Sequence, residues 1–279
     1  MDRCVLITGC SSGIGHATAR AFHEEGWDVV ATSRTAETLE SLSEIGCWTL
    51  SLDVTDESSI QSVVDSIEVE FGRLDCLVNN AGYAQLGPLE DIPIDRLKHQ
   101  FAVNVFGVHR LTNAVLPLLR ESHRGSIVSV SSSTTAVPLP GTGAYAGSKA
   151  ALETMHDALR SELAGSDINV VLVRAGTVNT AFATRAKEEL NSLHRSPSYQ
   201  SVYRLLDDWL AFDGGGPGAV EPETVARRIL HAASATQPEP EYVVGPIGKL
   251  ATLAAVIPAK FRDRALAVVF RLLNPRGTK

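Results

Sequence analysis

The chain of 279 residues lacks several features that mark other classes of protein. Aromatic residues make up only 6% of it and its net charge is −7, so neither base stacking nor phosphate neutralisation favours nucleic acid as a partner. No apolar run reaches the roughly 18 residues that a membrane-spanning helix needs. Met1-Asp2-Arg3 leads directly into the apolar residues 4–7, a stretch too short for a signal peptide. We therefore expect a cytoplasmic protein.

Cysteine is also scarce, with four residues in the whole chain: Cys4, Cys10, Cys47 and Cys76. No two of them form a C-x-x-C pair, and no paired histidines follow at the spacing of metal ligands, so no metal site is expected. Each cysteine lies in or beside an apolar run. We predict four small buried hydrophobic side chains with free thiols, as suits a reducing cytosol.

What the sequence does contain is a regular alternation of short apolar runs and longer amphipathic stretches. The runs are Cys4–Thr8, Asp28–Ser33, Trp48–Leu52, Cys76–Asn79, Ser126–Ser131, Asn169–Arg174 and Tyr242–Val244, and the amphipathic stretches include 14–25, 56–70, 95–120 and 148–164. Mostly continuous apolar runs are typical of strands covered on both faces. The alternation predicts an α/β fold, a Rossmann-type doubly wound parallel sheet flanked by helices, as one domain over 1–246.

The segment 181–220 interrupts this alternation. It is polar, contains Pro197, Gly214-Gly215-Gly216 and Pro217, and has a helical pattern only around 199–211. Its place between two core elements predicts a lid over a substrate site. The alternative is a surface insertion with no role in binding.

A glycine-rich turn joins the first strand to the first helix, with the sequence Thr8-Gly9-Cys10-Ser11-Ser12-Gly13-Ile14-Gly15. Glycines permit a tight turn and close approach to a pyrophosphate, whose charge the helix N-terminus attracts. The spacing G-x-x-x-G-x-G resembles the cofactor motif of the short-chain dehydrogenase/reductase family, and the resemblance extends over roughly 3–245. The residues expected to bind a nicotinamide dinucleotide here are Gly9, Ser11, Ser12, Gly13, Ile14 and Gly15.

The end of the second strand indicates which dinucleotide is used. NAD enzymes usually place an acid here that bonds the ribose 2′-hydroxyl, but this segment is Ala31-Thr32-Ser33-Arg34. A guanidinium binds a 2′-phosphate with charge-assisted bonds, and Ser12 could add a hydroxyl. We therefore predict NADP(H), with Arg34 as a phosphate ligand. The alternative is that Arg34 only caps a loop in solvent.

Further cofactor residues follow from the resemblance alone. It implies that the Asp53 carboxylate takes the adenine amino group and that Val54 lies against the ring, although Asp53 could instead cap the helix near Asp56. It implies a sheet-stabilising turn at Asn79-Asn80-Ala81-Gly82, with Asn80 near the ribose. In Arg174-Ala175-Gly176-Thr177-Val178-Asn179-Thr180 an alanine replaces the family's proline, so the loop is expected to be less rigid. The residues implied for the cofactor are Asp53, Val54, Asn80, Ala81, Gly82, Gly176, Val178 and Thr180.

Catalytic residues are indicated by the segment Tyr145-Ala146-Gly147-Ser148-Lys149. Tyr145 and Lys149 are four apart and share one helix face, so the ammonium and an oxidised nicotinamide are expected to lower the tyrosine pKa from about 10. Tyr145 could then act as general acid and base. The resemblance implies that Lys149 also holds the ribose, that Ser132 steadies the substrate oxygen, and that Asn104 holds a water for a proton relay. Ser131 and Ser133 are adjacent alternatives to Ser132.

The loops 83–97 and 137–144 and the segment 181–220 are expected to choose the substrate. They carry an apolar set consisting of Tyr83, Leu86, Leu89, Val137, Leu139, Phe182, Tyr199, Tyr203 and Trp209. Such a pocket suits a hydrophobic steroid-, retinoid- or lipid-like substrate. The sequence is similar to the hydroxysteroid and retinol dehydrogenase branch of the family. The alternative is that several of these residues only pack the lid.

The segment 247–279 is basic, with Lys249, Lys260, Arg262, Arg264, Arg271, Arg276 and Lys279 against one acid, Asp263. Apolar residues accompany the cations, and they are Leu250, Leu253, Val256, Ile257, Phe261, Leu266, Val269, Phe270 and Leu273. A basic amphipathic helix can lie on an anionic membrane surface. The favoured alternative is that its apolar face covers the substrate pocket or a subunit contact.

Together these features predict an NADP(H)-dependent oxidoreductase that moves a hydride between nicotinamide and a carbonyl or alcohol carbon. Two alternatives stay open: an NADPH-binding regulatory protein without turnover, and an NAD-dependent dehydrogenase. The resemblance implies a homodimer or homotetramer that pairs through the helices 95–120 and 148–164.

Overall fold

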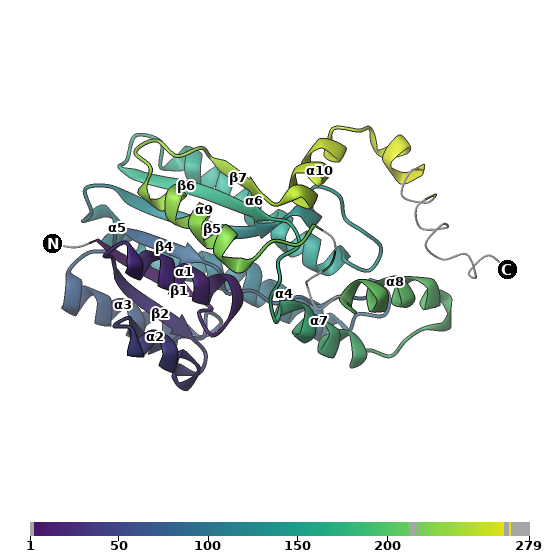
Figure 1. The fold of residues 1–279 in the computed structure, drawn as a ribbon, viewed down its shortest axis with the longest axis horizontal. Helices are drawn as coiled ribbons and strands as arrows, with labels where there is room; N and C mark the ends of the chain where they lie inside the picture. The colour runs from purple at the N-terminus through teal and green to yellow at the C-terminus, as the bar shows by residue number, and fades with distance from the viewer. Residues whose placement is uncertain (1–2, 212–215, 217, 265–267, 269–279) are drawn as a thin grey trace.

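The computed structural model describes residues 3–211, 216, 218–264 and 268, and these form a single parallel sheet of seven strands with helices on both faces (Figure 1). The strand order is β3-β2-β1-β4-β5-β6-β7. The chain therefore winds outward from β1 in one direction and then from β4 in the other. This confirms the predicted Rossmann-type doubly wound fold.

The strands lie where the apolar runs predict them. Their bounds are β1 Cys4–Thr8, β2 Asp28–Ser33, β3 Trp48–Ser51, β4 Cys76–Asn79, β5 Gly125–Ser132, β6 Ile168–Ala175 and β7 Glu241–Val244. All pair in parallel, and Ala175 pairs with both Ser132 and Val244. The alanine that stands where the resemblance implies a proline is therefore the last residue of β6.

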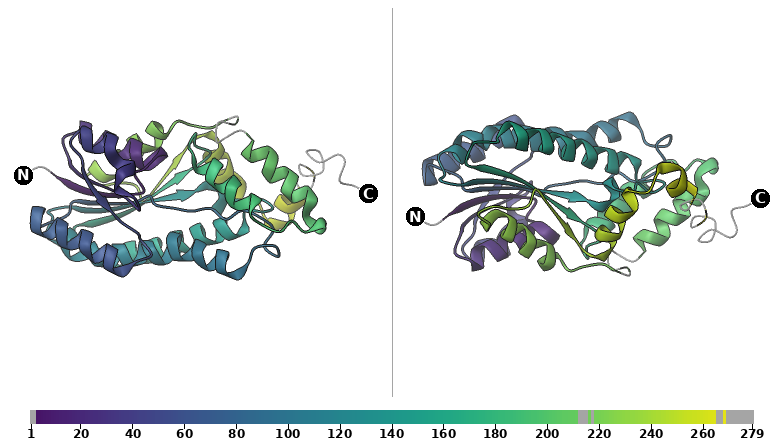
Figure 2. Two further views of the ribbon diagram at one scale, coloured as in Figure 1. Left: turned by 90° about the horizontal axis from the view of Figure 1, so that it is seen from below. Right: turned by 90° about the horizontal axis from the view of Figure 1, so that it is seen from above.

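Helices cover both faces of the sheet (Figure 2), and each face has its own apolar core. One face packs against α1 Gly13–Glu24, α2 Glu40–Glu44 and α9 Pro222–Ser234. The other packs against α3 Glu57–Phe71, α5 Val108–Arg120 and α6 Gly143–Glu162. All four cysteines are buried with free thiols, as predicted, and burial raises the pKa of each.

The predicted long helix over 95–120 is present but is not uniform. It consists of α4 Ile94–Phe101, a π-helical stretch η2 Ala102–Gly107, and α5. A methyl group at Gly107 would lie only 2.8 Å from Val54, so η2 packs tightly against the chain after β3. A π-helical turn inside a longer helix frequently marks a functional position.

The segment 181–220 starts and ends at one point of the fold. Val178 and Val220 form an isolated parallel bridge, and α7 Phe182–Asn191, the 3-10 turn η4 Pro197–Tyr199 and α8 Gln200–Leu210 lie between them. These helices pack around a third apolar cluster, separate from the two cores of the sheet. The helix expected at 199–211 is confirmed, whereas α7 is not predicted by the sequence pattern. Residues 212–215 and 217, with most of the glycine run, lie outside the described residues.

The C-terminal segment begins with α10 Pro246–Ala255, turns at 256–258, and is helical again over 259–264. It packs against β7 and against the 3-10 turn η3 Ser133–Thr135. Within the described part of the chain, none of the helices is both long enough and apolar enough to cross a bilayer. The predicted tail residues Leu266, Val269, Phe270, Arg271, Leu273, Arg276 and Lys279 lie outside the described residues.

Candidate active site

The glycine-rich turn has the geometry of a phosphate cradle. Gly9 and Gly13 have φ of +74° and +57°, values that favour glycine. A methyl group at Gly15 would lie 2.2 Å from the Gly9 carbonyl oxygen, so only glycine fits there. The first N–H groups of α1 have no partner within the helix, and helix geometry directs them at the turn. The structure thus fits a dinucleotide pyrophosphate, whose binding by Gly9, Ser11, Ser12, Gly13, Ile14 and Gly15 stays a prediction.

Asn80 ties the chain after β4 to this turn. Its Nδ2 donates to the carbonyl oxygens of Thr8 at 2.8 Å and Gly9 at 3.2 Å, and the backbone N–H groups of Asn80 and Ala81 donate to the Thr8 hydroxyl. The stabilising turn implied by the resemblance is therefore present. Gly82 lies between this turn and α6, since a methyl group added at Gly82 would be 3.6 Å from Lys149 Nζ.

At the end of β2 the polar groups divide between the interior and solvent. The Ser33 side chain is buried and bonds the Thr35 carbonyl oxygen and the Thr38 hydroxyl. Arg34 is exposed, and only its backbone carbonyl oxygen is engaged, by the Ser51 hydroxyl at 2.9 Å. Neither position carries an acid, so the site does not repel a 2′-phosphate.

A second arginine reaches the glycine-rich turn from the segment 181–220, the predicted lid. Arg185 of α7 donates from Nη2 to the Ser12 hydroxyl at 3.1 Å. Residues 12 and 185 are 173 apart in sequence, and nothing local in the sequence indicates this contact. The structure therefore adds a cation to the cofactor end of the site that sequence analysis missed.

Asp53 and Val54 close the turn after β3. Asp53 Oδ1 accepts bonds from the Thr55 N–H at 2.8 Å and the Thr55 hydroxyl at 2.7 Å. The N-cap of α3 is Asp56, whose carboxylate accepts from the Ser58 N–H, so the alternative role of Asp53 as that cap is wrong. Val54 is buried against Gly107. Contact of either residue with adenine stays a prediction.

Tyr145 and Lys149 lie on α6 facing the end of β5. Ser132 is the last residue of β5, and its side chain lies near enough to the Tyr145 phenol to lower the pKa of that phenol. Lys149 Nζ donates to the Val130 carbonyl oxygen at 2.9 Å. The adjacent Ser131 is buried and donates to Glu153 instead. The structure therefore brings together Ser132, Tyr145 and Lys149, and separates Ser131 from the phenol.

Burial dominates the electrostatics of this pair. It raises the pKa of Tyr145 to about 12, although the Ser132 side chain lowers it, while Glu153 raises it further. Burial also lowers the pKa of Lys149 to about 8, against the attraction of Glu153. The expectation that the ammonium and an oxidised nicotinamide together lower the tyrosine pKa stays a prediction. Near neutral pH the phenol holds its proton and Lys149 is charged.

Asn104 lies in the π-helical turn η2 and is fully buried. Its Oδ1 accepts from the Tyr83 N–H, and its Nδ2 donates to the Tyr83 carbonyl oxygen and to the Ser148 hydroxyl, all at 3.0 Å. These bonds explain why a locally unfavourable asparagine is tolerated within a helix. They connect it to the residue beside Lys149. The predicted water relay through Asn104 stays a prediction.

The loop after β6 lies against the glycine turn. A methyl group added at Gly13 would lie 2.9 Å from the Thr180 methyl group. The Thr180 hydroxyl accepts from the Phe182 N–H. Thr177 and Asn179 make the backbone bonds to Val220. The N–H and carbonyl of Val178 therefore point to the other side of the chain, and contact of Val178 with nicotinamide stays a prediction.

Comparison with known proteins decides the family. A model of short chain dehydrogenases matches residues 3–191. This chain belongs to the short-chain dehydrogenase/reductase family. It is 32% identical over 95% of its length to the uncharacterized oxidoreductase YbbO of Escherichia coli K12, of which 94% is covered. It is 34% identical to the NADPH-dependent 3-dehydrocapnine reductase of Ornithobacterium rhinotracheale, covering 94% of this chain and 95% of that protein.

A solved short-chain dehydrogenase from Streptomyces avermitilis has the same fold. It is 29% identical, with a TM-score of 0.79, and the match covers 100% of this chain and 99% of the other. The chain is thus an oxidoreductase with a nicotinamide-nucleotide-binding fold, as the sequence predicts.

Beside α6, the present chain carries an ionic network that the sequence analysis did not predict. Arg174 of β6 bonds both oxygens of Glu153, at 3.1 Å and 2.9 Å, and also pairs with Glu241 of β7. Glu153 further accepts from Ser131 at 2.5 Å and Thr135 at 3.0 Å. Glu153 lies one helical turn beyond Lys149, so the network anchors α6 to β5, β6 and β7.

The apolar residues expected to form the substrate pocket divide into two groups. Leu86 and Tyr203 are buried in the lid cluster, and the hydroxyls of Tyr199 and Tyr203 bond Glu90 and Asp91. For these residues the alternative, packing of the lid, is supported. Leu89, Leu139 and Trp209 are exposed. The Phe182 ring lies 5.7 Å from the Tyr145 ring, which places an apolar lid residue beside the phenol.

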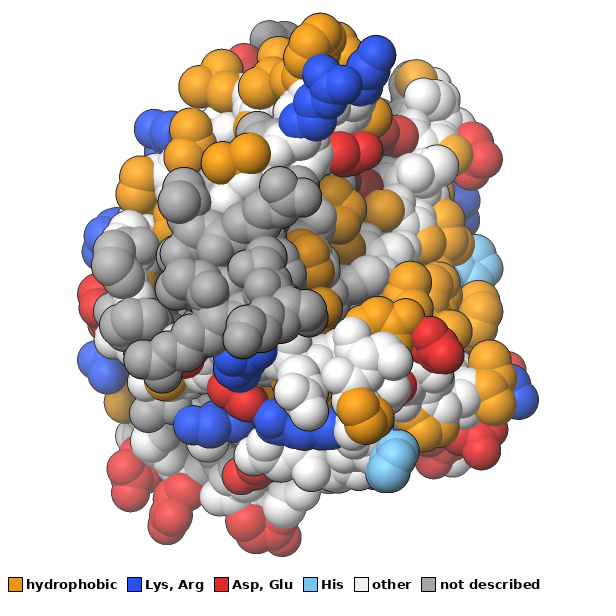
Figure 3. Space-filling model, turned by 90° about the vertical axis from the view of Figure 1, so that its right-hand side faces the viewer, with side chains coloured by type: hydrophobic (Ala, Val, Ile, Leu, Met, Phe, Trp, Pro, Cys, Tyr) orange, Lys and Arg blue, Asp and Glu red, His pale blue; other side chains and the backbone are white. Residues whose placement is uncertain are grey.

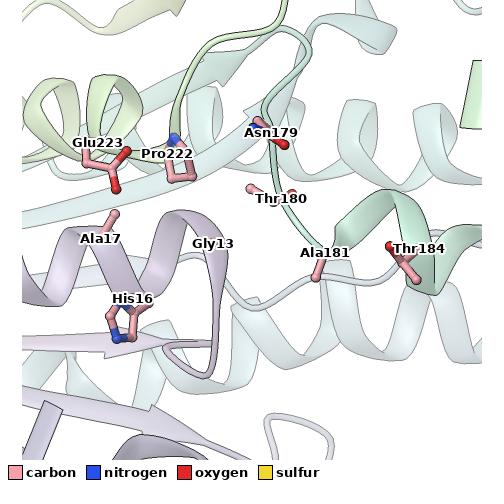
Figure 4. A pocket seen from close by; sticks show the side chains of 9 residues that line it. All are labelled: Gly13, His16, Ala17, Asn179, Thr180, Ala181, Thr184, Pro222 and Glu223. Atoms are coloured by element: carbon pink, nitrogen blue, oxygen red, sulfur yellow. The ribbon is translucent and has the colours of Figure 1, made fainter. Parts of the chain in front are cut away.

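A pocket of about 440 Å³ adjoins the glycine turn on the side of α9 (Figure 4). Its lining residues are Gly13, His16, Ala17, Asn179, Thr180, Ala181, Thr184, Pro222 and Glu223. Gly13 and Thr180 also border the cofactor loop, so the pocket is an outer extension of the cofactor region. Burial lowers the pKa of His16, and its Nε2 lies 3.1 Å from the Ser41 hydroxyl.

Proposed function

We propose that this chain is an NADP(H)-dependent reductase that converts a carbonyl group of a hydrophobic substrate to an alcohol. The observation that carries the proposal is the arrangement of Tyr145 and the buried Lys149 one turn apart on α6, with Ser132 at the end of β5 beside the phenol. A phenol that keeps its proton near neutral pH is suited to give that proton to a carbonyl oxygen.

The residues would share the work as follows. The substrate oxygen lies between the Ser132 hydroxyl and the Tyr145 phenol, which donates its proton as negative charge develops. When bound, the reduced nicotinamide supplies the hydride to the carbonyl carbon. Hydride and proton together complete the alcohol. Lys149 stays charged below its pKa of about 8 and offsets the tyrosinate that remains.

A preference for NADP(H) is supported by two arginines, Arg34 after β2 and Arg185 of α7, which contacts Ser12. Arg34 is exposed where an NAD enzyme would carry an acid, and Arg185 contacts Ser12 from the lid. The relative from Ornithobacterium rhinotracheale is named as NADPH-dependent. A guanidinium such as that of Arg34 or Arg185 suits a phosphate dianion, because it forms charge-assisted hydrogen bonds with it. The alternative of an NAD-dependent dehydrogenase requires that neither arginine contacts the cofactor.

Cofactor preference is tested by measuring kcat/KM with NADPH and with NADH. Arg34→Asp should lower the NADPH to NADH ratio about 100-fold, and Arg185→Gln about tenfold, because each removes a charge-assisted bond. Arg204→Gln, which changes an exposed arginine of α8 elsewhere on the lid, is the matched control and should leave the ratio unchanged. An unchanged ratio in Arg34→Asp would reject the phosphate contact.

A hydrophobic substrate is supported by the Phe182 ring beside Tyr145 and by the exposed Leu89 and Leu139 on the loops around α6. A panel of ketones, aldehydes, steroids and retinoids, followed by NADPH absorbance, would identify the class. Tyr145→Phe removes the proton donor and should lower kcat about 1,000-fold while NADPH still binds. NADPH binding without turnover across the whole panel would favour a regulatory protein.

We also propose a homodimer or homotetramer that pairs through α4, α5 and α6. Phe106, in η2 between α4 and α5, and Met155 of α6 support this, since both are exposed apolar residues. Sedimentation velocity of Phe106→Ser should show a smaller assembly than the unmodified protein. A monomer in both would reject the proposal.

A further inference from the structure

The C-terminal segment 247–264 is apolar on the side that faces solvent. Leu250 and Leu253 are both 68% exposed, Val256 is 83% exposed and Phe261 is 60% exposed. On α10 the side that packs is the opposite one, where Gly248 is buried. A protein that stays in water rarely gathers this many exposed large apolar side chains on one segment.

Cations accompany these side chains. Lys249, Lys260, Arg262 and Arg264 lie within 247–264, where Asp263 is the one acid. The whole chain carries −7, so this segment has the opposite sign to the rest of the molecule. Figure 3 shows the side of the molecule that is on the right in Figure 1, and at its top Lys and Arg side chains lie next to hydrophobic ones. An apolar surface with basic residues around it complements an anionic lipid interface.

The same segment contacts the catalytic region directly. A methyl group at Gly176 would lie 2.9 Å from the Gly248 N–H, so α10 touches the backbone of the loop that leads to Val178 and Thr180. α10 also packs against η3, which follows Ser132. The exposed apolar side chains therefore lie next to the end of the sheet where the phenol and the lid meet.

We propose that 247–264 docks the enzyme on an anionic lipid surface, so that a carbonyl substrate with an apolar chain is taken from the lipid rather than from water. The identity of the substrate rests on the proposed function, whereas the docking does not. A second copy of this chain is a poorer occupant, because a two-fold contact through this face would bring the four cations of each copy together.

Docking is tested with the full chain and vesicles of phosphatidylcholine, alone or mixed with anionic phosphatidylglycerol. We expect the protein to sediment with the mixed vesicles with an affinity at least about tenfold higher than with the neutral ones. The double variant Leu250→Ser/Leu253→Ser should lose this binding, and Lys260→Glu/Arg264→Glu should lose the preference for the anionic lipid. Val69→Ser changes an apolar residue of α3 that is 87% exposed, and should bind like the unmodified protein.

Three results would overturn the inference: no sedimentation at low salt, equal sedimentation of the leucine variant, or a smaller oligomer in that variant, which would assign the face to a second copy. Turnover of a water-soluble aldehyde with NADPH should be unchanged in the leucine variant. If that turnover is present but vesicles are not bound, the docking fails and the proposed function stands. If vesicles are bound but no carbonyl compound is reduced, the proposed function fails alone.

Discussion

The two sides of the active site are built in different ways. On the sheet side, polar groups bond backbone atoms of other segments, as the half-buried Asn80 does with Thr8 and the buried Lys149 with Val130. On the lid side, exposed long side chains pair with each other, as Arg96 does with Glu189 and Arg195 with Asp207. Buried bonds to the backbone are costly to break, whereas exposed ion pairs contribute little. The side chains on the sheet side are therefore held more tightly in place, whereas the lid segment can vary in sequence.

The largest effect is expected from Gly15→Ala. Its methyl group would lie 2.2 Å from the Gly9 carbonyl oxygen, so the turn must shift and NADPH binding should be lost together with about 3 kcal/mol of unfolding free energy. Urea unfolding and NADPH titration measure both. Gly147→Ala is the control, because a methyl group there meets nothing within 4 Å, and it should be neutral or slightly stabilising. A normal Gly15→Ala protein would contradict the rigid turn.

A somewhat smaller loss is expected from Glu153→Gln. It removes the charge that two nitrogens of Arg174 share, and should lower the free energy of unfolding by about 2 kcal/mol. Because Glu153 raises the pKa values of both Tyr145 and Lys149, both should fall in the variant. The pH at which reduction declines should therefore move to lower pH. Glu162→Gln, an exposed change on the same helix, should alter neither property.

His156 on α6 makes the stability of the sheet side depend on pH. Burial lowers its pKa to about 4, so the folded protein holds it neutral while the unfolded chain takes up a proton near pH 6.5. Stability is thus fully present above about pH 6.5 and is lost as the pH falls toward 4, by at most about 1.4 kcal/mol per pH unit. Urea unfolding of His156→Gln should show a flatter pH dependence. Parallel curves for the two proteins would reject this linkage.

The smallest effect is expected on the lid, from Arg195→Gln. It removes the pair with Asp207, yet both side chains are more than a third exposed, so the unfolding free energy should change by about 0.5 kcal/mol or less. A loss above about 2 kcal/mol would show that the lid unfolds with the core and would break the comparison drawn above.

The same contrast explains what could be predicted from the sequence. Continuous apolar runs have a strong signal, so all seven strands were predictable within a residue or two of their bounds. The predicted catalytic residues Tyr145 and Lys149 are detectable because a helix places them one turn apart. α7 has no such signal, since Ala186 and Leu190 are its only buried residues. The contacts of Arg185 with Ser12 and of Glu153 with Arg174 join distant segments and depend on the finished fold.

The bridge between Val178 and Val220 has an evolutionary and practical consequence. It joins the two stems of the lid where they leave the sheet, so the length and sequence of the stretch between them do not affect the register of any strand. Exchanging the part of that stretch beyond Arg185 should leave the strands intact, and it should also keep the contacts of Thr180 and Arg185 with the glycine turn. Changes in this stretch can therefore alter substrate selectivity while the strands and the residues that they carry stay the same.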